Sequence, residues 1–272
     1  MVDFKKENLQ AQDWVKVRAS TDGEQSFLTW VGSVYSMVPG ERKQHLFQIV
    51  GMSAARCIPK PDGGWDFTSR ELTFYLDPNT REILRKWKNP WTGEEELPVV
   101  HVANNGVQGV FKRPFPAIVE GDTTAFVFDL FSHYPNPLAD DLRFAPYSPQ
   151  PIYQATELFK LTVSTTELRN EETTSVSQVM LAWDRIGPWV PWMKMGDRPG
   201  NLVYSAWGGK VASFSELPQL LQEEIKTRVP LYKNAPKSQS EIEDMTSWTY
   251  FKKHFDAYLR AEIFPIPERE AS

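Results

Sequence analysis

Apolar and polar residues alternate along most of the first two thirds of the chain, with short turn-forming sequences between the alternating runs. This period of two is typical of antiparallel strands that bury one face. The first runs are joined by short turns such as DPNT and NPWTGEE, so we expect five consecutive strands to form a meander. The alternation predicts strands over residues 26–38, 45–58, 65–76, 81–87, 98–105, 123–134, 152–165 and 175–186.

Eight or more strands without intervening helices indicate a mainly β fold, in which an antiparallel sheet closes into a barrel or curves strongly, as in calycins. Helical periodicity appears only near the C-terminus, over about 214–229 and 246–261. Ser215 is placed to cap the first of these segments, and Thr246 or Ser247 the second. We expect both helical segments to pack against the barrel.

The chain has 272 residues, a length that allows one large domain or two small ones. It has no internal repeat, so we expect a single domain over residues 1–272. Asp and Glu outnumber Lys and Arg by 35 to 30, and the net charge is -5. Nucleic acids and anionic membranes bind surfaces dense in Lys and Arg, so neither is an expected partner.

The absence of several known motifs excludes the classes of protein that depend on them. The single cysteine, Cys57, excludes an intrachain disulfide, and no Cys or His cluster has zinc-site spacing. The chain also lacks glycine-rich nucleotide loops, a G-x-S-x-G motif and an H-E-x-x-H motif, so we expect no cofactor and no metal. No apolar stretch is long enough for a secretory leader or a spanning helix, and a cytoplasmic protein without a membrane partner is expected.

Aromatic residues are abundant, with 10 Trp, 16 Phe and 9 Tyr. Their rings fill either a bulky β-rich core or the walls of a pocket for an apolar ligand. If there is a pocket, Trp30, Trp183 and Tyr153 are expected in its wall. Two proline-containing segments, 134–151 and 187–200, are long enough to form a loop or wall over such a pocket, although a tract like the second is more often a packed connector.

A lone carboxylate interrupts the apolar face of one predicted strand. Glu157 alternates with Tyr153 and Phe159 along residues 152–165, and an apolar environment raises the pKa of a carboxyl group into the range of a general acid or base. Arg185 alternates with apolar residues on a later strand, where it can pair with Glu157 or hold an oxygen atom of a ligand. The alternative is a structural ion pair inside the barrel.

A histidine interrupts the apolar run PVVHVANN at residues 98–105. Strand alternation predicts that His101 shares a face with Val99, Ala103 and Asn105. Its unperturbed pKa lies near neutrality, so His101 is the best candidate for a general base, and Asn105 is a candidate to bind a ligand oxygen. The alternative is a core histidine whose hydrogen bonds are made by the backbone.

Two further polar residues stand at strand positions near predicted openings. Arg56 ends the strand 45–58, and Asp129 precedes a His133-Tyr134 pair that leads into the proline-rich segment. Either residue is a candidate to bind a substrate at the mouth of a pocket. A strand-end arginine is also typical of a charge solvated at the rim.

Three segments resemble a known family: VGMSAARCIP, TSRELTFYLDPNTREILRKWKNPWTGEEELPVVHVANN and TSWTYFKKHF. Together they are similar to a bacterial and fungal family catalogued as a domain of unknown function, over about residues 14–258. The resemblance implies an antiparallel β-barrel and a link to secondary metabolism, with a cyclase-type activity. It implies no catalytic residues for this chain.

These observations favour a cofactor-independent enzyme that acts on an apolar or aromatic small molecule by acid-base chemistry, as a cyclase, isomerase, dehydratase or decarboxylase. His101 would be the base and Glu157 the proton donor, while Arg185 or Asn105 holds an oxyanion. The alternative is a non-catalytic carrier or sensor of hydrophobic ligands. A purely structural module would have no cavity above roughly 300 Å³. The sequence leaves the oligomeric state open, and a homodimer is compatible with it.

Overall fold

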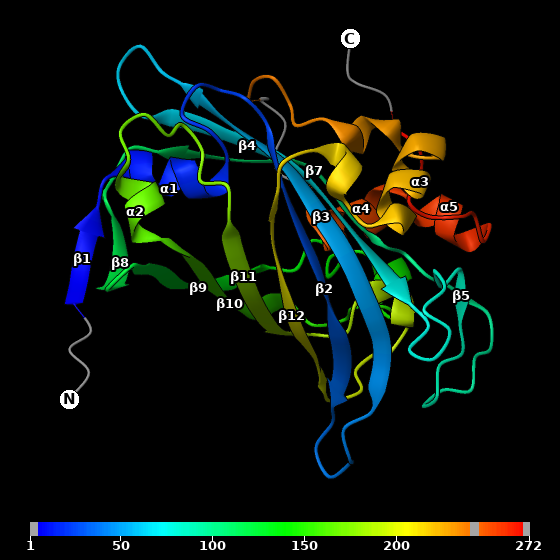
Figure 1. The fold of residues 1–272 in the computed structure, drawn as a ribbon. Coiled ribbons are helices and arrows are strands. Elements are labelled where there is room, and N and C mark those ends of the chain that lie inside the picture. Colours follow the sequence, from blue (N-terminus) through cyan, green and yellow to red (C-terminus); the bar gives the residue numbers. More distant parts are fainter. Residues whose placement is uncertain (1–4, 240–244, 269–272) are drawn as a thin grey trace.

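A sheet of ten antiparallel strands dominates the computed structural model, which describes residues 5–239 and 245–268 (Figure 1). The sheet curves strongly into a half-barrel, and the predicted mainly β fold with a curved antiparallel sheet is therefore confirmed. From one edge to the other the strands are β1 (Lys5–Leu9), β8 (Phe115–Glu120), β9 (Thr123–Pro135), β10 (Ile152–Ser164), β11 (Val179–Gly187), β12 (Asn201–Val211), β2 (Ser26–Met37), β3 (His45–Pro59), β4 (Trp65–Leu76) and β7 (Val102–Phe111).

The expected five-strand meander is wrong at its fourth strand. Within residues 81–87 only β5 (Lys86–Trp87) is a strand, and it pairs with β6 (Leu97–Pro98) in a separate two-stranded sheet. The meander of β2, β3 and β4 continues instead into β7, which begins at Val102. Residues 99–101 lie outside both strands, so the predicted strand 98–105 is interrupted and only its second part belongs to β7.

The helix α1 (Ala11–Arg18) identifies the inner face of the curved sheet. Its Val17 packs with Leu161 of β10 and Leu181 of β11, and its Val15 packs with Cys57 of β3. One short helix can touch strands on both sides of the sheet only from inside the curve. Residues that share a face with Leu161, Leu181 and Cys57 therefore face inward.

The predicted C-terminal helical segments are shorter than expected. The first divides into η3 (Phe214–Glu216) and α3 (Gln219–Thr227), because Pro218 stands at the N-cap of α3 in place of the expected Ser215. The second divides into α4 (Ser247–Lys253) and α5 (Phe255–Leu259), and the side chain of Thr246 accepts a hydrogen bond from the amide of Thr249, as its predicted capping role requires. The remaining short helices are η1 (Leu142–Phe144), α2 (Thr165–Arg169), η2 (Pro191–Met193) and η4 (Pro230–Lys233).

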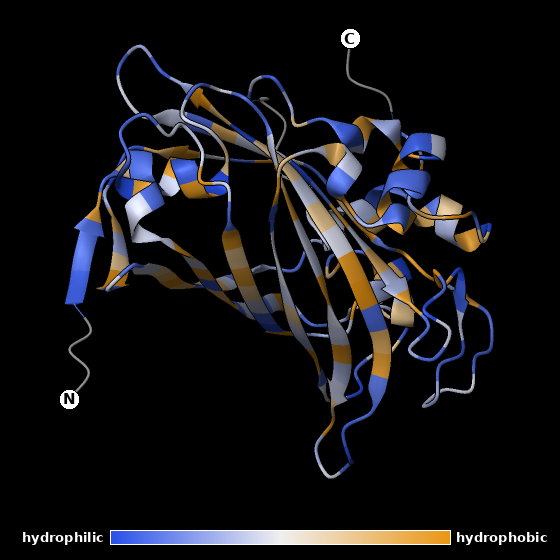
Figure 2. Cartoon of the chain, in the orientation of Figure 1, coloured by the Kyte–Doolittle hydropathy of each residue, from blue (hydrophilic) through white to orange (hydrophobic). Residues whose placement is uncertain are grey.

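The C-terminal part of the chain covers the outer face of β3, β4 and β7, where α3, α4 and α5 gather in Figure 1. Arg70 of β4 anchors this layer by donating hydrogen bonds to the backbone oxygens of Leu231 and Asn234, at 3.3 and 2.8 Å. Figure 2 shows apolar and polar residues alternating along the long strands, whereas β1 is hydrophilic. This difference explains why alternation predicted β2, β3 and β4 but not β1.

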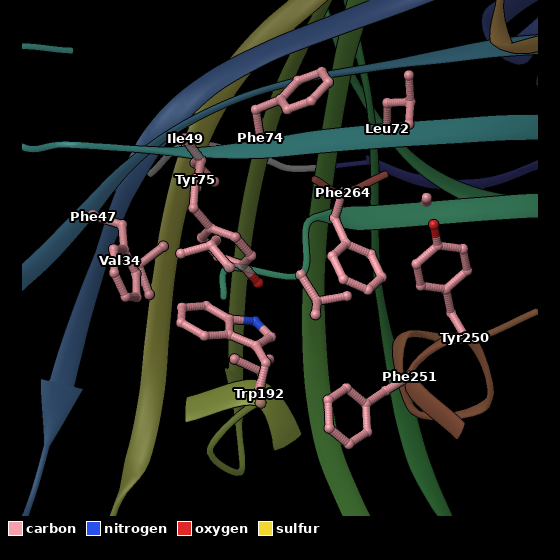
Figure 3. Packing of buried hydrophobic residues seen from close by; sticks show 14 of the residues in the cluster. Val34, Phe47, Ile49, Leu72, Phe74, Tyr75, Trp192, Tyr250, Phe251 and Phe264 are labelled. Atoms are coloured by element: carbon pink, nitrogen blue, oxygen red, sulfur yellow. The ribbon is translucent and has the colours of Figure 1, made fainter. Parts of the chain in front are cut away.

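One end of the half-barrel is filled by Trp192 of η2. Its ring centroid lies 5.6 Å from that of Tyr75 and 5.7 Å from those of Phe47 and Trp87. Figure 3 shows Trp192 below Tyr75, with Phe47 to the side. The helix α1 occupies the inner face further along the strands. The inner surface of β10, β11 and β12 therefore lies between two plugs, which are the side chain of Trp192 at one end and the helix α1 at the other.

Candidate functional site

An acidic and a basic side chain meet on the inner face of the sheet between the two plugs. Glu157 of β10 stands opposite Arg185 of β11, and Arg185 Nε lies 3.8 Å from Glu157 Oε1. The indole Nε1 of Trp183 donates a 2.8 Å hydrogen bond to Glu157 Oε2. The side chain of Glu157 is 30% exposed, so this carboxylate is held by two neighbours and is still open to solvent.

Arg185 is buried and joins Glu157 to a phenol. Its Nη2 donates a 2.8 Å hydrogen bond to Tyr153 Oη, and its guanidinium lies 5.1 Å from the ring centre of Tyr204. The guanidinium lies only 2.7 Å from the position that a Cβ at Gly187 would take, so a side chain there would displace the guanidinium. Burial lowers the pKa of Arg185, but Tyr153, Tyr204 and Glu157 outweigh burial and raise it, which keeps the group charged.

Tyrosine rings extend this cluster across the inner face. Tyr134 stacks on Tyr153 with centroids 4.7 Å apart, and the hydroxyls of Tyr204 and Tyr75 lie 3.0 Å from each other. Burial raises the pKa of Tyr134 to about 12 and also raises the pKa values of Tyr204 and Tyr75. These three phenols therefore stay neutral at pH 7 and act as hydrogen-bonding groups beside the charged pair.

Tyr153 also lines a cleft of about 360 Å³ at the rim of the half-barrel. The walls of the cleft come from residues 136–154, from residues 188–201 and from Trp248 of α4. Both proline-containing segments singled out in the sequence thus contribute to one cleft. Its volume falls within the range of small-molecule sites. Because Tyr153 contacts Arg185 through its hydroxyl, one residue connects the cleft to the charged cluster.

His101 lies apart from the cluster. It is 2% exposed, and its Nδ1 accepts a 3.1 Å hydrogen bond from the backbone amide of Tyr75. Burial, reinforced by the positive charges of Arg85 and Arg228, lowers the pKa of His101 to about 3, so the ring is neutral. The cavity beside it measures about 10 Å³, room for a single water molecule. Among the described residues, no hydrogen bond or ion pair joins His101 to Glu157.

Asn105 is used by the outer layer of the fold. Its Oδ1 accepts a 2.7 Å hydrogen bond from Arg70 Nε, and its Nδ2 donates one of 3.2 Å to Glu268 in the C-terminal segment. The neighbouring Asn104 lies opposite Glu71 and so faces inward. Asn105 thus shares a face with Ala103, as the alternation predicted, but this is the outer face of the sheet, away from the charged cluster.

The other predicted residues fall in three different places. Trp30 lies on the inner face opposite Gly51 and packs against both large apolar clusters. Arg56 donates a 2.7 Å hydrogen bond to the backbone oxygen of Gly23 and so ties a loop to the sheet. Asp129 stands opposite Leu158, which places it on the outer face, where it is exposed. The structure thus brings together Tyr153, Glu157, Trp183 and Arg185, and separates His101, Asn105, Arg56 and Asp129 from them.

Sequence reasoning missed Tyr204 and Tyr75 as members of the cluster. Tyr204 belongs to β12, whose sequence NLVYSAWGGKV contains two consecutive glycines that weaken the strand signal. Its alternation of Leu202, Tyr204 and Ala206 was the available sign. Tyr75 stands near the end of a correctly predicted strand, and its neighbours in sequence give no sign that its hydroxyl meets another polar group.

The fold and the site define a half-barrel β protein with an aromatic-lined charged cluster on its inner face. A family model described as "Protein of unknown function (DUF1838)" matches residues 23–255, so the chain belongs to this family and the resemblance to a domain of unknown function is confirmed. No curated protein matches the chain. In the described ranges, no helix has the length and apolarity to cross a membrane, and no three His, Cys, Asp or Glu side chains form a metal-binding group.

Proposed function

We propose that this protein is an enzyme that rearranges an apolar or aromatic small molecule by acid-base chemistry without a cofactor. The observation that carries the proposal is the link between cleft and cluster: Tyr153 lines the 360 Å³ cleft and accepts a hydrogen bond from Arg185, which in turn faces Glu157. A ligand in the cleft is one side chain away from a charged pair in an aromatic environment. Such a placement suits proton transfer.

In this proposal Glu157 replaces His101 as the base. Glu157 takes a proton from a carbon next to a substrate carbonyl, and the electrons of that C–H bond form a C=C bond. The carbonyl oxygen receives the proton of Tyr153, whose phenolate is stabilised by the charge of Arg185. Glu157 then delivers its proton to a different carbon of the conjugated system while Tyr153 takes back the enol proton, which gives an isomer. Attack of the enol carbon on a second carbonyl group of the same molecule gives a ring, with the Glu157 proton passing to the new alkoxide and the enol proton returning to Tyr153.

His101 has a structural role in this account. Its Nδ1 is occupied by the Tyr75 amide, its pKa is about 3, and the adjacent 10 Å³ cavity is too small for any substrate. A base needs to reach the proton that it removes, either directly or through one water molecule. The partly exposed Glu157 meets this condition better.

The second candidate is a non-catalytic carrier of hydrophobic ligands. It is favoured by the ion pair itself, since Arg185 and Trp183 each engage one oxygen of the Glu157 carboxylate, as in a structural ion pair. A purely structural module is disfavoured by the cleft, whose 360 Å³ exceed what such a module is expected to leave open.

Untargeted mass spectrometry separates enzyme from carrier. A metabolite extract is incubated with the wild type, with Glu157→Gln and Tyr153→Phe, and with Asp129→Asn as a control on the outer face. The enzyme proposal predicts that the wild type and the control convert a metabolite into an isomer or a dehydrated or decarboxylated product, while the other two variants bind it unchanged. If all four proteins retain the same unchanged compound, the carrier is the correct reading.

A further inference from the structure

The rim cleft has aromatic walls contributed by distant parts of the chain. Tyr147 comes from the proline-rich segment, Trp189 from the segment after β11, and Trp248 from α4. The ring of Trp248 meets that of Tyr153 edge to face, with centroids 4.7 Å apart. Trp189 packs over Gly200, where a Cβ would lie 2.6 Å from the indole, so this wall depends on glycine. The walls favour a flat, ring-shaped ligand.

The uncharged polar groups around the cleft are mostly side-chain amides. Gln150, Gln154 and Asn201 stand among its lining residues. Asn136 is already used within the fold, because its Nδ2 donates to the backbone oxygens of Ser148 and Gln150. Amides bind hydroxyl and carbonyl groups and carry no net charge.

The positive charge in the cleft wall is already paired. Arg198 Nη2 forms a hydrogen-bonded ion pair with Glu41 Oε1, from the turn between β2 and β3. The other oxygen of Glu41 accepts a 2.9 Å hydrogen bond from Trp91 Nε1, and the guanidinium lies 5.6 Å from the ring centre of Trp91. Glu41 does not line the cleft, yet it cancels the charge of a residue that does. The remaining charged lining residue is Asp197, which is exposed and negative.

We infer that the cleft binds an uncharged, planar aromatic compound carrying a hydroxyl or carbonyl group, and that Glu41 is a specificity residue that excludes anionic analogues. This inference rests on the proposed role of the cleft as the ligand site, and it does not depend on catalysis. With Glu41 in place, a ligand carboxylate meets a neutralised arginine and the negative Asp197. With Glu41 neutral, the same carboxylate meets a free guanidinium.

The test measures binding of two matched probes, 2-naphthol and 2-naphthoate, by equilibrium dialysis at pH 7. Four proteins are compared: the wild type, Glu41→Gln, the double variant Glu41→Gln/Arg198→Gln, and Glu94→Gln. Glu94 serves as the matched control, because it forms a comparable ion pair with Lys194, at 2.8 Å, and neither residue lines the cleft. Circular dichroism melting verifies that each variant is folded.

The wild type and Glu94→Gln are expected to bind 2-naphthol at least about tenfold more tightly than 2-naphthoate, the effect of roughly one unfavourable charge contact. Glu41→Gln is expected to bring 2-naphthoate to within about threefold of 2-naphthol, and the double variant to lose that gain. Tighter binding of 2-naphthoate by the wild type, no change in Glu41→Gln, or no binding of either probe would overturn the inference. Because no turnover is measured, failure here is distinct from failure of the proposed reaction.

Discussion

His101 and Glu157 make an instructive pair, because each is a titratable residue within an apolar run and the fold treats them in opposite ways. The fold encloses His101: a backbone amide occupies its Nδ1, and the exposed fraction is 2%. Glu157 is restrained by Arg185 and Trp183 but keeps 30% of its side chain exposed on the inner face. A polar residue within an apolar run is therefore a functional candidate only when its remaining hydrogen-bonding capacity faces a space that a ligand can enter.

The largest effect on stability is expected at the enclosed residue. His101→Ala removes a ring that packs against Phe74, with centroids 5.0 Å apart, and leaves the Tyr75 amide without its acceptor. The cavity and the lost hydrogen bond together are expected to cost roughly 3–5 kcal/mol in the free energy of unfolding. Urea denaturation measures this cost. A loss below about 1 kcal/mol would mean that the histidine is not a core residue.

A pH series sharpens the same comparison. The pKa of His101 is about 3 in the folded state and near 6.5 when unfolded, so between these values the unfolded chain binds one more proton. Stability from this group is complete above pH 6.5 and is lost as the pH falls toward 3. From pH 7 to pH 5 the wild type is expected to lose about 2 kcal/mol more than His101→Asn, whose Oδ1 can accept the Tyr75 hydrogen bond. Parallel curves for the two proteins would contradict the assignment.

Within the charged cluster, Tyr153→Phe tests the hydrogen bond between Arg185 and Tyr153, which joins the rim cleft to the Glu157–Arg185 ion pair. The variant keeps the aromatic packing against Tyr134 and Trp248 but leaves buried Arg185 Nη2 without its 2.8 Å acceptor. Loss of a hydrogen bond to a buried charged group is expected to cost about 1–2 kcal/mol in stability. Thermal melting followed by circular dichroism measures it. An unchanged melting temperature would show that Arg185 does not depend on Tyr153.

The smallest effect is expected on the outer face. Asp129→Asn changes an exposed residue that lies opposite Leu158, away from Glu157. Its stability is expected to stay within about 0.5 kcal/mol of the wild type, and its conversion of any metabolite to be unchanged. A loss of conversion in this variant would place the site on the opposite side of the sheet from the one proposed.

Regular alternation explains which parts of the molecule were predictable. Strands β2, β3, β4, β9 and β10 coincide closely with their predicted ranges. Because β10 and β11 are unbroken, alternation correctly assigned Glu157 and Arg185 to the same face as their apolar neighbours. Asn105 also shares a face with Ala103, as predicted, but alternation does not tell which face of β7 turns inward, and this face is covered by the C-terminal layer. The break in the strand at residues 99–101 was not predictable either, since Val99 and Val100 are themselves good strand residues.

The parts of the site that depend on tertiary contact were not predictable. Tyr204 joins the cluster because β12 lies between β11 and β2, an order that alternation does not encode. Glu41 reaches Arg198 across 157 positions of sequence, and their pairing depends on how a turn and a loop meet. Local pattern therefore gives the strands and the inward face, while the partners of each polar group come from the topology of the sheet.

The most direct test compares Glu157→Gln with His101→Asn. For each variant, two quantities are measured: the rate of conversion of the metabolite that mass spectrometry identifies as the substrate, and the free energy of unfolding. The account predicts opposite outcomes. Glu157→Gln should lose about 10²–10⁴-fold in turnover, the range for removal of a general base, with a stability loss of only about 1–2 kcal/mol from the lost counter-charge of Arg185. His101→Asn should lose stability and keep turnover per folded molecule. Full activity in Glu157→Gln together with loss of activity in folded His101→Asn would contradict it and restore the histidine as the base.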